Sequence, residues 1–127
     1  GVGYYLNVHE GPNGFRWKIV PERKDNAVLE AGMVTSDEPG LYLEGRFGIR
    51  HENLLVCCEG EKNEYGRFMY FEPLTLVPFD LDGVDPAQMS GRERKLLNEY
   101  HAKVYETIAP YLPEAEQAWL KVATRAV

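Results

Sequence analysis

The chain has 127 residues, of which 44% are hydrophobic and 12% aromatic, values typical of about one globular domain rather than of a disordered segment. Its 14 Lys and Arg and 20 Asp and Glu residues give a net charge of -6, which argues against a surface for nucleic acid or anionic membrane, because such surfaces must neutralise phosphates. No run of residues approaches the roughly 18 uninterrupted apolar positions of a membrane helix.

The two cysteines, Cys57 and Cys58, are adjacent in the sequence. Neighbouring residues of a strand point to opposite faces, so this pair is poorly placed for a disulfide or a shared metal. Such cysteine usage suits a reducing compartment, and we therefore expect a cytoplasmic protein.

The first region, residues 1–85, is predicted to consist mostly of antiparallel strands with short connections. Strand patterns cover residues 4–8, 15–20, 28–36, 49–58, 68–71 and 74–79. Turns are expected at Pro39 and Gly40 and between Gly45 and Gly48, and residues 59–67 are expected to form a solvated loop.

The second region, residues 86–127, changes to helical periodicity. Ser90 and Glu93 match a capping box that opens a helix, and a second helix is predicted over residues 114–124. The residues expected to face the core are Leu97, Tyr100, Val104 and Ile108 of the first helix and Ala115, Trp119 and Val122 of the second. His101 is expected on the polar side of its helix. We interpret both helices as a structural extension packed on the sheet.

Two glutamates stand out in the segment SDEPGLYLEGRFGIRHEN, residues 36–53. In a regular strand Glu52 shares a face with Arg50 and with apolar side chains, and a carboxylate there is costly unless a cation, metal or donor compensates. An ion pair between Glu52 and Arg50 would suffice, and Glu38 could be a surface acid before Pro39. On spacing alone this structural interpretation is favoured for both carboxylates.

The histidines are weaker candidates. His9 follows an extended segment, where a single histidine is more often a hydrogen-bonded structural group than a ligand. His51 would point to the face opposite Glu52, and neither His51 nor His101 is assigned a catalytic role.

Several segments taken together resemble one family. YLNVHEGP, LEAGMVTSDEPGLY, FGIRHENLLV, FEPLTLVPFD and LNEYHAKV occur in the order and approximate spacing of the C-terminal part of aminopeptidase P. These are the metal-dependent Xaa-Pro aminopeptidases of the creatinase-like, pita-bread peptidases. The resemblance runs over essentially the whole chain.

The resemblance implies an α+β fold, namely the C-terminal half of a pita-bread domain, with an antiparallel sheet followed by C-terminal helices. It implies a site with two Mn²⁺ ions that removes the residue preceding a proline at the second position of a peptide, by attack of a metal-activated hydroxide. Glu38 matches a metal ligand that assists proton transfer, and Glu52 matches the bridging ligand. His9 matches a donor to the substrate or developing oxyanion, and Arg50 matches an arginine that braces the ligands.

The rest of that family's ligand set, a histidine in a GHG motif and two aspartates, would lie ahead of Gly1, and the chain opens without Met in a strand-like pattern. We therefore expect a C-terminal fragment that lacks the N-terminal half of its catalytic domain. Such a fragment should show no peptidase activity and weak or no Mn²⁺ binding, because the chelate is incomplete. Its uncovered apolar surface should favour self-association, with a homodimer as the simplest form.

Three alternatives remain open. A prolidase or a methionine aminopeptidase relative would share both glutamates. A nonenzymatic pita-bread domain could instead bind proteins, although such relatives tend to lose the metal carboxylates.

Overall fold

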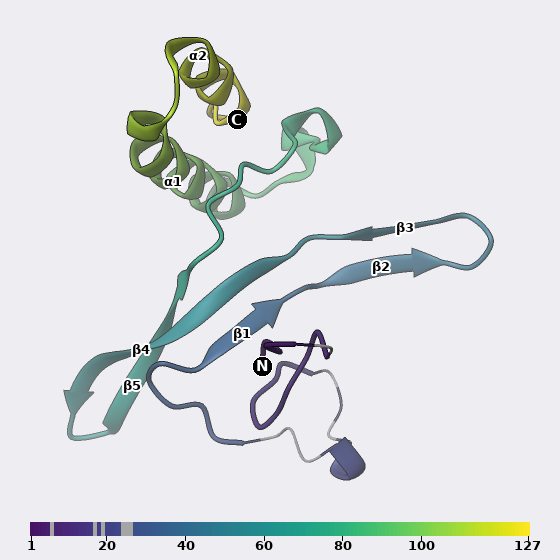
Figure 1. Cartoon of the computed structure of the whole chain (residues 1–127), viewed down its shortest axis with the longest axis vertical. Coiled ribbons are helices and arrows are strands. Elements are labelled where there is room, and N and C mark those ends of the chain that lie inside the picture. The colour runs from purple at the N-terminus through teal and green to yellow at the C-terminus, as the bar shows by residue number, and fades with distance from the viewer. Residues whose placement is uncertain (6, 17, 19, 24–26) are drawn as a thin grey trace. The chain divides into compact units, whose positions relative to one another are not determined.

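The computed structural model describes residues 1–5, 7–16, 18, 20–23 and 27–127 (Figure 1). The chain forms two compact units, Gly1–Thr75 and Leu76–Val127. Their boundary lies earlier in the chain than the expected one at residue 85. The first unit holds the strands and the second the two longer helices, which confirms the predicted α+β order of antiparallel sheet followed by helices.

The first four strands form one long antiparallel hairpin that is interrupted at the same level on both arms (Figure 1). β1 pairs with β4 and β2 with β3, and the register is the same on both sides of the interruption. Asp37 lies opposite Asn53 before it, and Gly40 lies opposite Arg50 after it. The strands are β1 (Val34–Asp37), β2 (Gly40–Leu43), β3 (Phe47–Arg50) and β4 (Asn53–Asn63).

The interruption itself consists of two facing residue pairs. Continuing the register across it places Glu38 opposite Glu52 and Pro39 opposite His51, and the His51 N–H donates to the Pro39 carbonyl at 3.1 Å. The predicted continuous strand over residues 49–58 is therefore wrong. Proline has no N–H to give to the ladder, so regular pairing stops at Pro39 and resumes beyond it.

The predicted turn at Pro39 and Gly40 is also wrong, because Gly40 begins β2. The chain reverses instead at Gly45, whose φ of 66° is in the left-handed region that glycine adopts without strain. The expected bend near Gly45 is thus confirmed, whereas Gly48 lies within β3.

The predicted loop over residues 59–67 is a β-hairpin. β4 continues to Asn63, and β5 (Gly66–Pro73) returns along it after a two-residue turn. An ion pair between Arg67 and Glu59, with 3.2 Å between nitrogen and oxygen, crosses its two arms. The polar composition of residues 59–67 favours a loop. The segment can nevertheless form strands, because both arms are exposed to solvent near the turn and a strand there needs no apolar face.

Other predicted strands are shorter or absent. β1 begins only at Val34, because a turn with Gly32 at a φ of 88° precedes it. The expected strand over residues 74–79 does not form; the Leu74 N–H donates to the Leu54 carbonyl at 2.8 Å, and pairing ends there.

The N-terminal segment is held by isolated contacts rather than by strands. Of the expected strands over residues 4–8 and 15–20, Leu6, Trp17 and Ile19 lie outside the described residues, and the rest are not in strands. An isolated antiparallel bridge joins Val2 to His9. Without a continuous neighbour to accept its N–H groups, an alternating pattern alone does not produce a strand.

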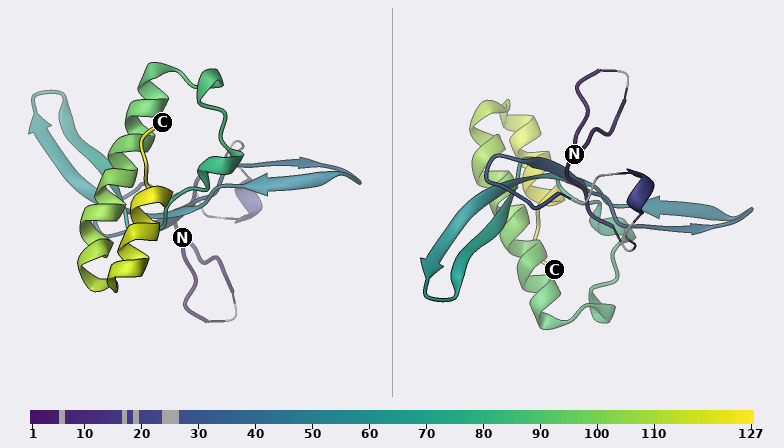
Figure 2. Two further views of the ribbon diagram at one scale, coloured as in Figure 1. Left: turned by 90° about the horizontal axis from the view of Figure 1, so that it is seen from above. Right: turned by 90° about the horizontal axis from the view of Figure 1, so that it is seen from below.

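The second unit contains α1 (Gly91–Ile108) and α2 (Glu114–Ala123), which lie side by side and are joined through the 3-10 turn η4 (Ala109–Tyr111) (Figure 2). Two short 3-10 turns, η2 (Leu81–Gly83) and η3 (Pro86–Gln88), precede α1. The predicted capping box is confirmed, since the Ser90 N–H donates to the Glu93 carboxylate at 2.7 Å and the Glu93 N–H donates to the Ser90 hydroxyl at 3.3 Å.

The core of this unit joins Val104 of α1, Ala109 of η4 and Leu120 of α2. Half-buried residues packed against it are Leu76, Tyr100, Tyr105, Ile108 and Leu112. The predicted inner face of α1 is confirmed. The predicted face of α2 is wrong, because Trp119 and Val122 are 63% and 61% exposed.

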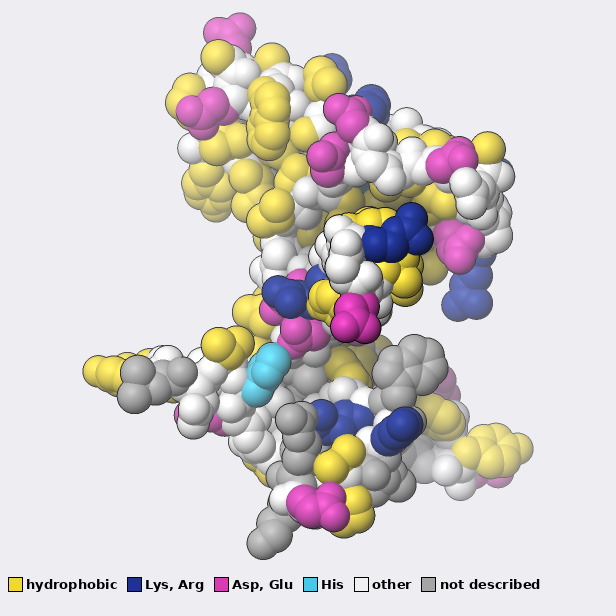
Figure 3. All heavy atoms as spheres, turned by 90° about the vertical axis from the view of Figure 1, so that its right-hand side faces the viewer, with side chains coloured by type: hydrophobic (Ala, Val, Ile, Leu, Met, Phe, Trp, Pro, Cys, Tyr) yellow, Lys and Arg dark blue, Asp and Glu magenta, His cyan; other side chains and the backbone are white. Residues whose placement is uncertain are grey.

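Periodicity alone could not choose between these faces of α2. Packing against Val104 of α1 and Ala109 of η4 places Leu120 in the core. Yellow hydrophobic side chains are accordingly visible on the surface of the helical unit, among charged ones (Figure 3).

His101 is fully buried, so its predicted position on the polar side of α1 is wrong. It is four residues after Leu97 and three before Val104, which places it on the inner face. The Phe79 N–H donates to its Nε2 at 3.0 Å, so this nitrogen must carry a lone pair and the imidazole is neutral. Burial lowers the pKa of His101 from its ordinary 6.5, and the nearby Arg125 backbone partly offsets this.

We expect the stability of the helical unit to fall on mild acidification. The unfolded chain takes up a proton near pH 6.5, whereas folded His101, with its lowered pKa, does not, so the free energy of unfolding decreases as the pH falls below that value. Urea unfolding of the chain between about pH 7.5 and 5 measures the slope. His101→Gln, which keeps an acceptor for the Phe79 N–H, should flatten it. An equal slope in both proteins would contradict the prediction.

None of the described helices combines the length and apolarity needed to cross a membrane.

Candidate functional site

The candidate site is built around the two facing carboxylates of the interrupted hairpin. Glu38 and Glu52 occupy opposite positions of the register, where two like charges destabilise a sheet. Arg50 offsets this repulsion: its Nε lies 3.7 Å from Glu38 Oε2 and 3.4 Å from Glu52 Oε2. The arrangement therefore holds two carboxylates around the Arg50 guanidinium.

Neither carboxylate is buried in this chain. The Glu38 side chain is 28% exposed and that of Glu52 is 40% exposed. The predicted burial of Glu52 among apolar side chains is therefore not found, because the strand is interrupted at this residue. Both groups remain open to a ligand from solvent.

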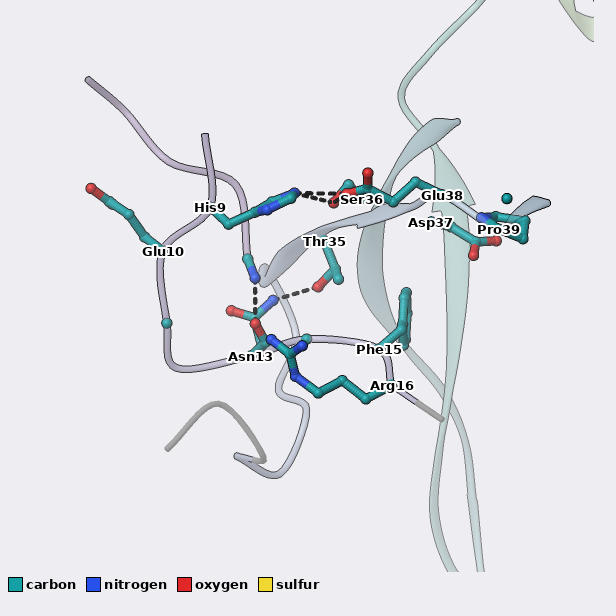
Figure 4. Close-up of a pocket in the computed structure, with 14 residues that line it drawn as sticks. His9, Glu10, Asn13, Phe15, Arg16, Thr35, Ser36, Asp37, Glu38 and Pro39 are labelled. Carbon is teal, nitrogen blue, oxygen red and sulfur yellow. Dashed lines mark hydrogen bonds and ion pairs between the residues drawn. The ribbon is translucent and has the colours of Figure 1, made fainter. Parts of the chain in front are cut away.

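His9 reaches the same site from the N-terminal segment (Figure 4). Its Nε2 lies 2.7 Å from Glu38 Oε1, and the Ser36 hydroxyl donates to the same oxygen at 2.8 Å. These donors and Arg50 lower the pKa of Glu38, with the Ser36 hydrogen bond as the largest cause, while burial works against them. Glu38 is therefore an ionised carboxylate at neutral pH.

A buried asparagine anchors the segment that carries His9. The Asn13 amide donates to the Val34 carbonyl at 3.0 Å and also to the Thr35 hydroxyl, so it ties the loop to β1 (Figure 4). Asn13 and Thr35 are both buried. This anchor sets the distance between His9 and Glu38, although the two are far apart in the sequence.

Arg50 is held from the other side by Tyr42. The Tyr42 ring lies across Gly40 and Gly48, where an added Cβ would come within 2.7 Å of it. Contact with the Tyr42 hydroxyl, and then with Glu52 and Glu38, raises the pKa of Arg50. The two glycines thus let an aromatic side chain pack flat on the hairpin and reach the guanidinium.

His9, Ser36 and Glu38 line a cleft of about 800 Å³, within the range of small-molecule sites. Phe15 and Arg16 contribute to its wall (Figure 4). The Asp37 side chain points away from that of Glu38 (Figure 4).

The sequence-based candidates thus converge: His9, Glu38, Arg50 and Glu52 are linked by direct contacts. Sequence reasoning missed Ser36, Asn13 and Tyr42. Alternation would have found Ser36, which lies on β1 two residues before Glu38 and therefore points to the same side of the chain. No local signal marks Asn13, whose side-chain amide donates to β1, a strand distant in the sequence.

The donor set suits a hard cation, since Mn²⁺ prefers carboxylate oxygen. Among the residues that the structure describes, however, no group of three or more His, Cys, Asp or Glu side chains is arranged to hold a metal ion. Glu38 and Glu52 are compatible with a metal centre but do not complete one.

Two family models match successive parts of the chain. Residues 1–59 match metallopeptidase family M24, and residues 67–127 match the C-terminal region of peptidase_M24. The first match contains the candidate site, and the second contains β5 from Arg67 onward and both helices.

Relatives cover the chain from end to end. It is 42% identical over 132 residues to a probable Xaa-Pro aminopeptidase P of Arthroderma otae, and 39% identical over 130 residues to aminopeptidase P1 of Arabidopsis thaliana. Each alignment includes 100% of this chain but only 21% and 20%, respectively, of the relative. The chain thus spans about one fifth of the length of these proteins.

A solved structure has a similar fold. It is described as X-prolyl aminopeptidase from Caenorhabditis elegans, a cytosolic enzyme with a di-nuclear active site. The similarity has a TM-score of 0.79 at 34% identity and covers 99% of this chain and 20% of that one. With matches to two consecutive family models, sequence similarity along this whole chain and a similar fold, the chain is similar to metallopeptidase family M24 and to Xaa-Pro aminopeptidases.

Proposed function

We propose that this chain is the C-terminal part of the pita-bread catalytic domain of a cytosolic, manganese-dependent Xaa-Pro aminopeptidase. The observation that carries the proposal is the meeting of Glu38 and Glu52 at facing positions, with His9 beside them in one cleft. A structural ion pair alone needs one carboxylate for Arg50. Two opposed carboxylates and a histidine are better explained by binding of a cation and a polar substrate than by a structural ion pair.

The side chains take distinct roles. Glu52 and Glu38 would both hold the metal ions, and Glu38 would also move a proton. His9 turns from Glu38 to the substrate and donates to the carbonyl oxygen where negative charge develops. Arg50 orients Glu52 through its 3.4 Å contact. When bound, the metal ions supply Lewis acidity and lower the pKa of water toward neutrality.

The similarity to Xaa-Pro aminopeptidases and the chemistry of proline support the proposed substrate class. The peptide bond before proline is a tertiary amide and has no N–H group. Peptidases that hydrogen-bond to this N–H in other substrates therefore cannot hold such a bond in the same way. Peptides with proline at the second position are therefore the proposed substrates.

The test uses the full-length enzyme that carries this chain. Tripeptides with proline at the second position should be cleaved, and matched tripeptides with alanine there should not. Removal of metal by a chelator should abolish the activity and Mn²⁺ should restore it. The isolated chain, in which Glu38 and Glu52 are the proposed ligands, should be inactive and bind Mn²⁺ weakly.

Other outcomes identify the alternatives. Cleavage confined to dipeptides would indicate a prolidase, and removal of methionine irrespective of proline would indicate a methionine aminopeptidase. Absence of any metal-dependent turnover in the full-length protein would overturn the proposal and leave the protein-binding interpretation.

We also propose self-association as a homodimer. Apolar side chains exposed along β2 and β3 support it, among them Leu41, Tyr42 and Ile49. Sedimentation at increasing concentration tests this, and a constant monomer mass would contradict it.

A further inference from the structure

Ser36 lies between the two groups to which the proposed function gives catalytic roles. Its hydroxyl oxygen is 2.8 Å from Glu38 Oε1 and 3.4 Å from His9 Nε2, and His9 Nε2 is itself 2.7 Å from the same Glu38 oxygen. The three polar atoms thus form a closed triangle at the cleft wall (Figure 4).

The protons in this triangle can be assigned from chemistry. An ionised carboxylate only accepts hydrogen bonds, so Glu38 Oε1 receives the Ser36 O–H and the His9 Nε2–H. The second oxygen, Oε2, lies instead toward Arg50, at 3.7 Å from Nε, on the side where Glu52 Oε2 contacts the same nitrogen. One oxygen of Glu38 is therefore held by donors of the chain, and the other faces Glu52.

The two donors are not equivalent in a reaction. His9 sits on the N-terminal segment, is half exposed, and must leave Glu38 to reach a substrate. Ser36 is on β1, two residues before Glu38, and its backbone is paired with Leu54 in the sheet. It can therefore keep its hydrogen bond while His9 moves.

We infer that Ser36 is the positioning residue that fixes the Glu38 carboxylate, so that Oε1 stays bound to the chain and Oε2 remains turned toward Glu52 as the metal-facing oxygen. This inference rests on the proposed function and assigns Ser36 no contact with substrate. It implies that the hydroxyl, rather than the volume of the side chain, matters. Partners of this kind typically change metal affinity or activity by about 10–100-fold.

The test compares Ser36→Ala with Ser36→Thr in the full-length enzyme. Calorimetric titration of the metal-free proteins with Mn²⁺ should show affinity lowered by about 10-fold or more in Ser36→Ala and kept within about 3-fold in Ser36→Thr. With a proline tripeptide, kcat should fall in the alanine variant while KM changes little, because the substrate contacts are intact. The electron paramagnetic resonance spectrum of bound Mn²⁺ should change in the same variant.

Unchanged Mn²⁺ affinity and kcat in Ser36→Ala would overturn the inference, and so would an equal loss in Ser36→Thr, which would indicate packing. Should Ser36→Ala fail to fold, Ser36→Cys keeps a similar volume with a weak donor and gives the same comparison. Failure of the proposed function is distinguishable, because it would appear in the unmodified enzyme as an absence of Mn²⁺ binding and turnover.

Discussion

Replacing Glu52 with glutamine in the full-length enzyme should lower kcat/KM for a proline tripeptide by about 10³-fold or more, equivalent to about 4 kcal/mol of transition-state stabilisation. Glutamine keeps the size of the side chain but cannot offer two charged oxygens to two cations. Steady-state kinetics with saturating Mn²⁺ gives the value.

The same substitution should leave the metal-free chain about as stable as before. It removes one like-charge repulsion with Glu38 and one half-exposed ion pair with Arg50, and each is worth about 1 kcal/mol or less, with opposite signs. Urea unfolding of the isolated chain measures this. A large loss of stability would show that Glu52 is a structural group.

Glu59→Gln is the matched control. Glu59 lies on β4, the strand that follows Glu52, and it too pairs with an arginine, Arg67, at 3.2 Å, but on the exposed β4–β5 hairpin. Activity should be unchanged in this variant. If both glutamine variants lost activity equally, the effect would not come from the site.

Leu120→Ala should destabilise the helical unit by about 3 kcal/mol. Leu120 is almost fully buried against Val104 and Ala109, so truncation loses apolar contact and leaves a cavity. A small domain has only about 5 kcal/mol or somewhat more of total stability, so most of it would be lost. Urea unfolding of the isolated chain, followed by helical circular dichroism, measures the change.

Val122→Ala on the same helix is its control, because Val122 is largely exposed. It should cost about 0.5 kcal/mol or less. Equal costs at the two positions would mean that α2 turns a different face to the core.

Sequence reasoning singled out Glu38, Glu52, His9 and Arg50, and the structure places these four side chains in contact, whereas the roles proposed for them stay predictions. The capping box of α1 is predicted by Ser90 and Glu93 and is confirmed, because a cap depends on residues only three apart in the sequence.

The tertiary structure decided which groups meet. That Glu38 faces Glu52 follows from pairing across the whole hairpin, and that His9 reaches Glu38 follows from the Asn13 anchor on β1. The choice of Leu120 over Trp119 for the core, and the burial of His101, depended on how α2 and Phe79 pack against α1. Periodicity records which residues share a face of one element, whereas the partner of that face is set by contacts between segments distant in the sequence.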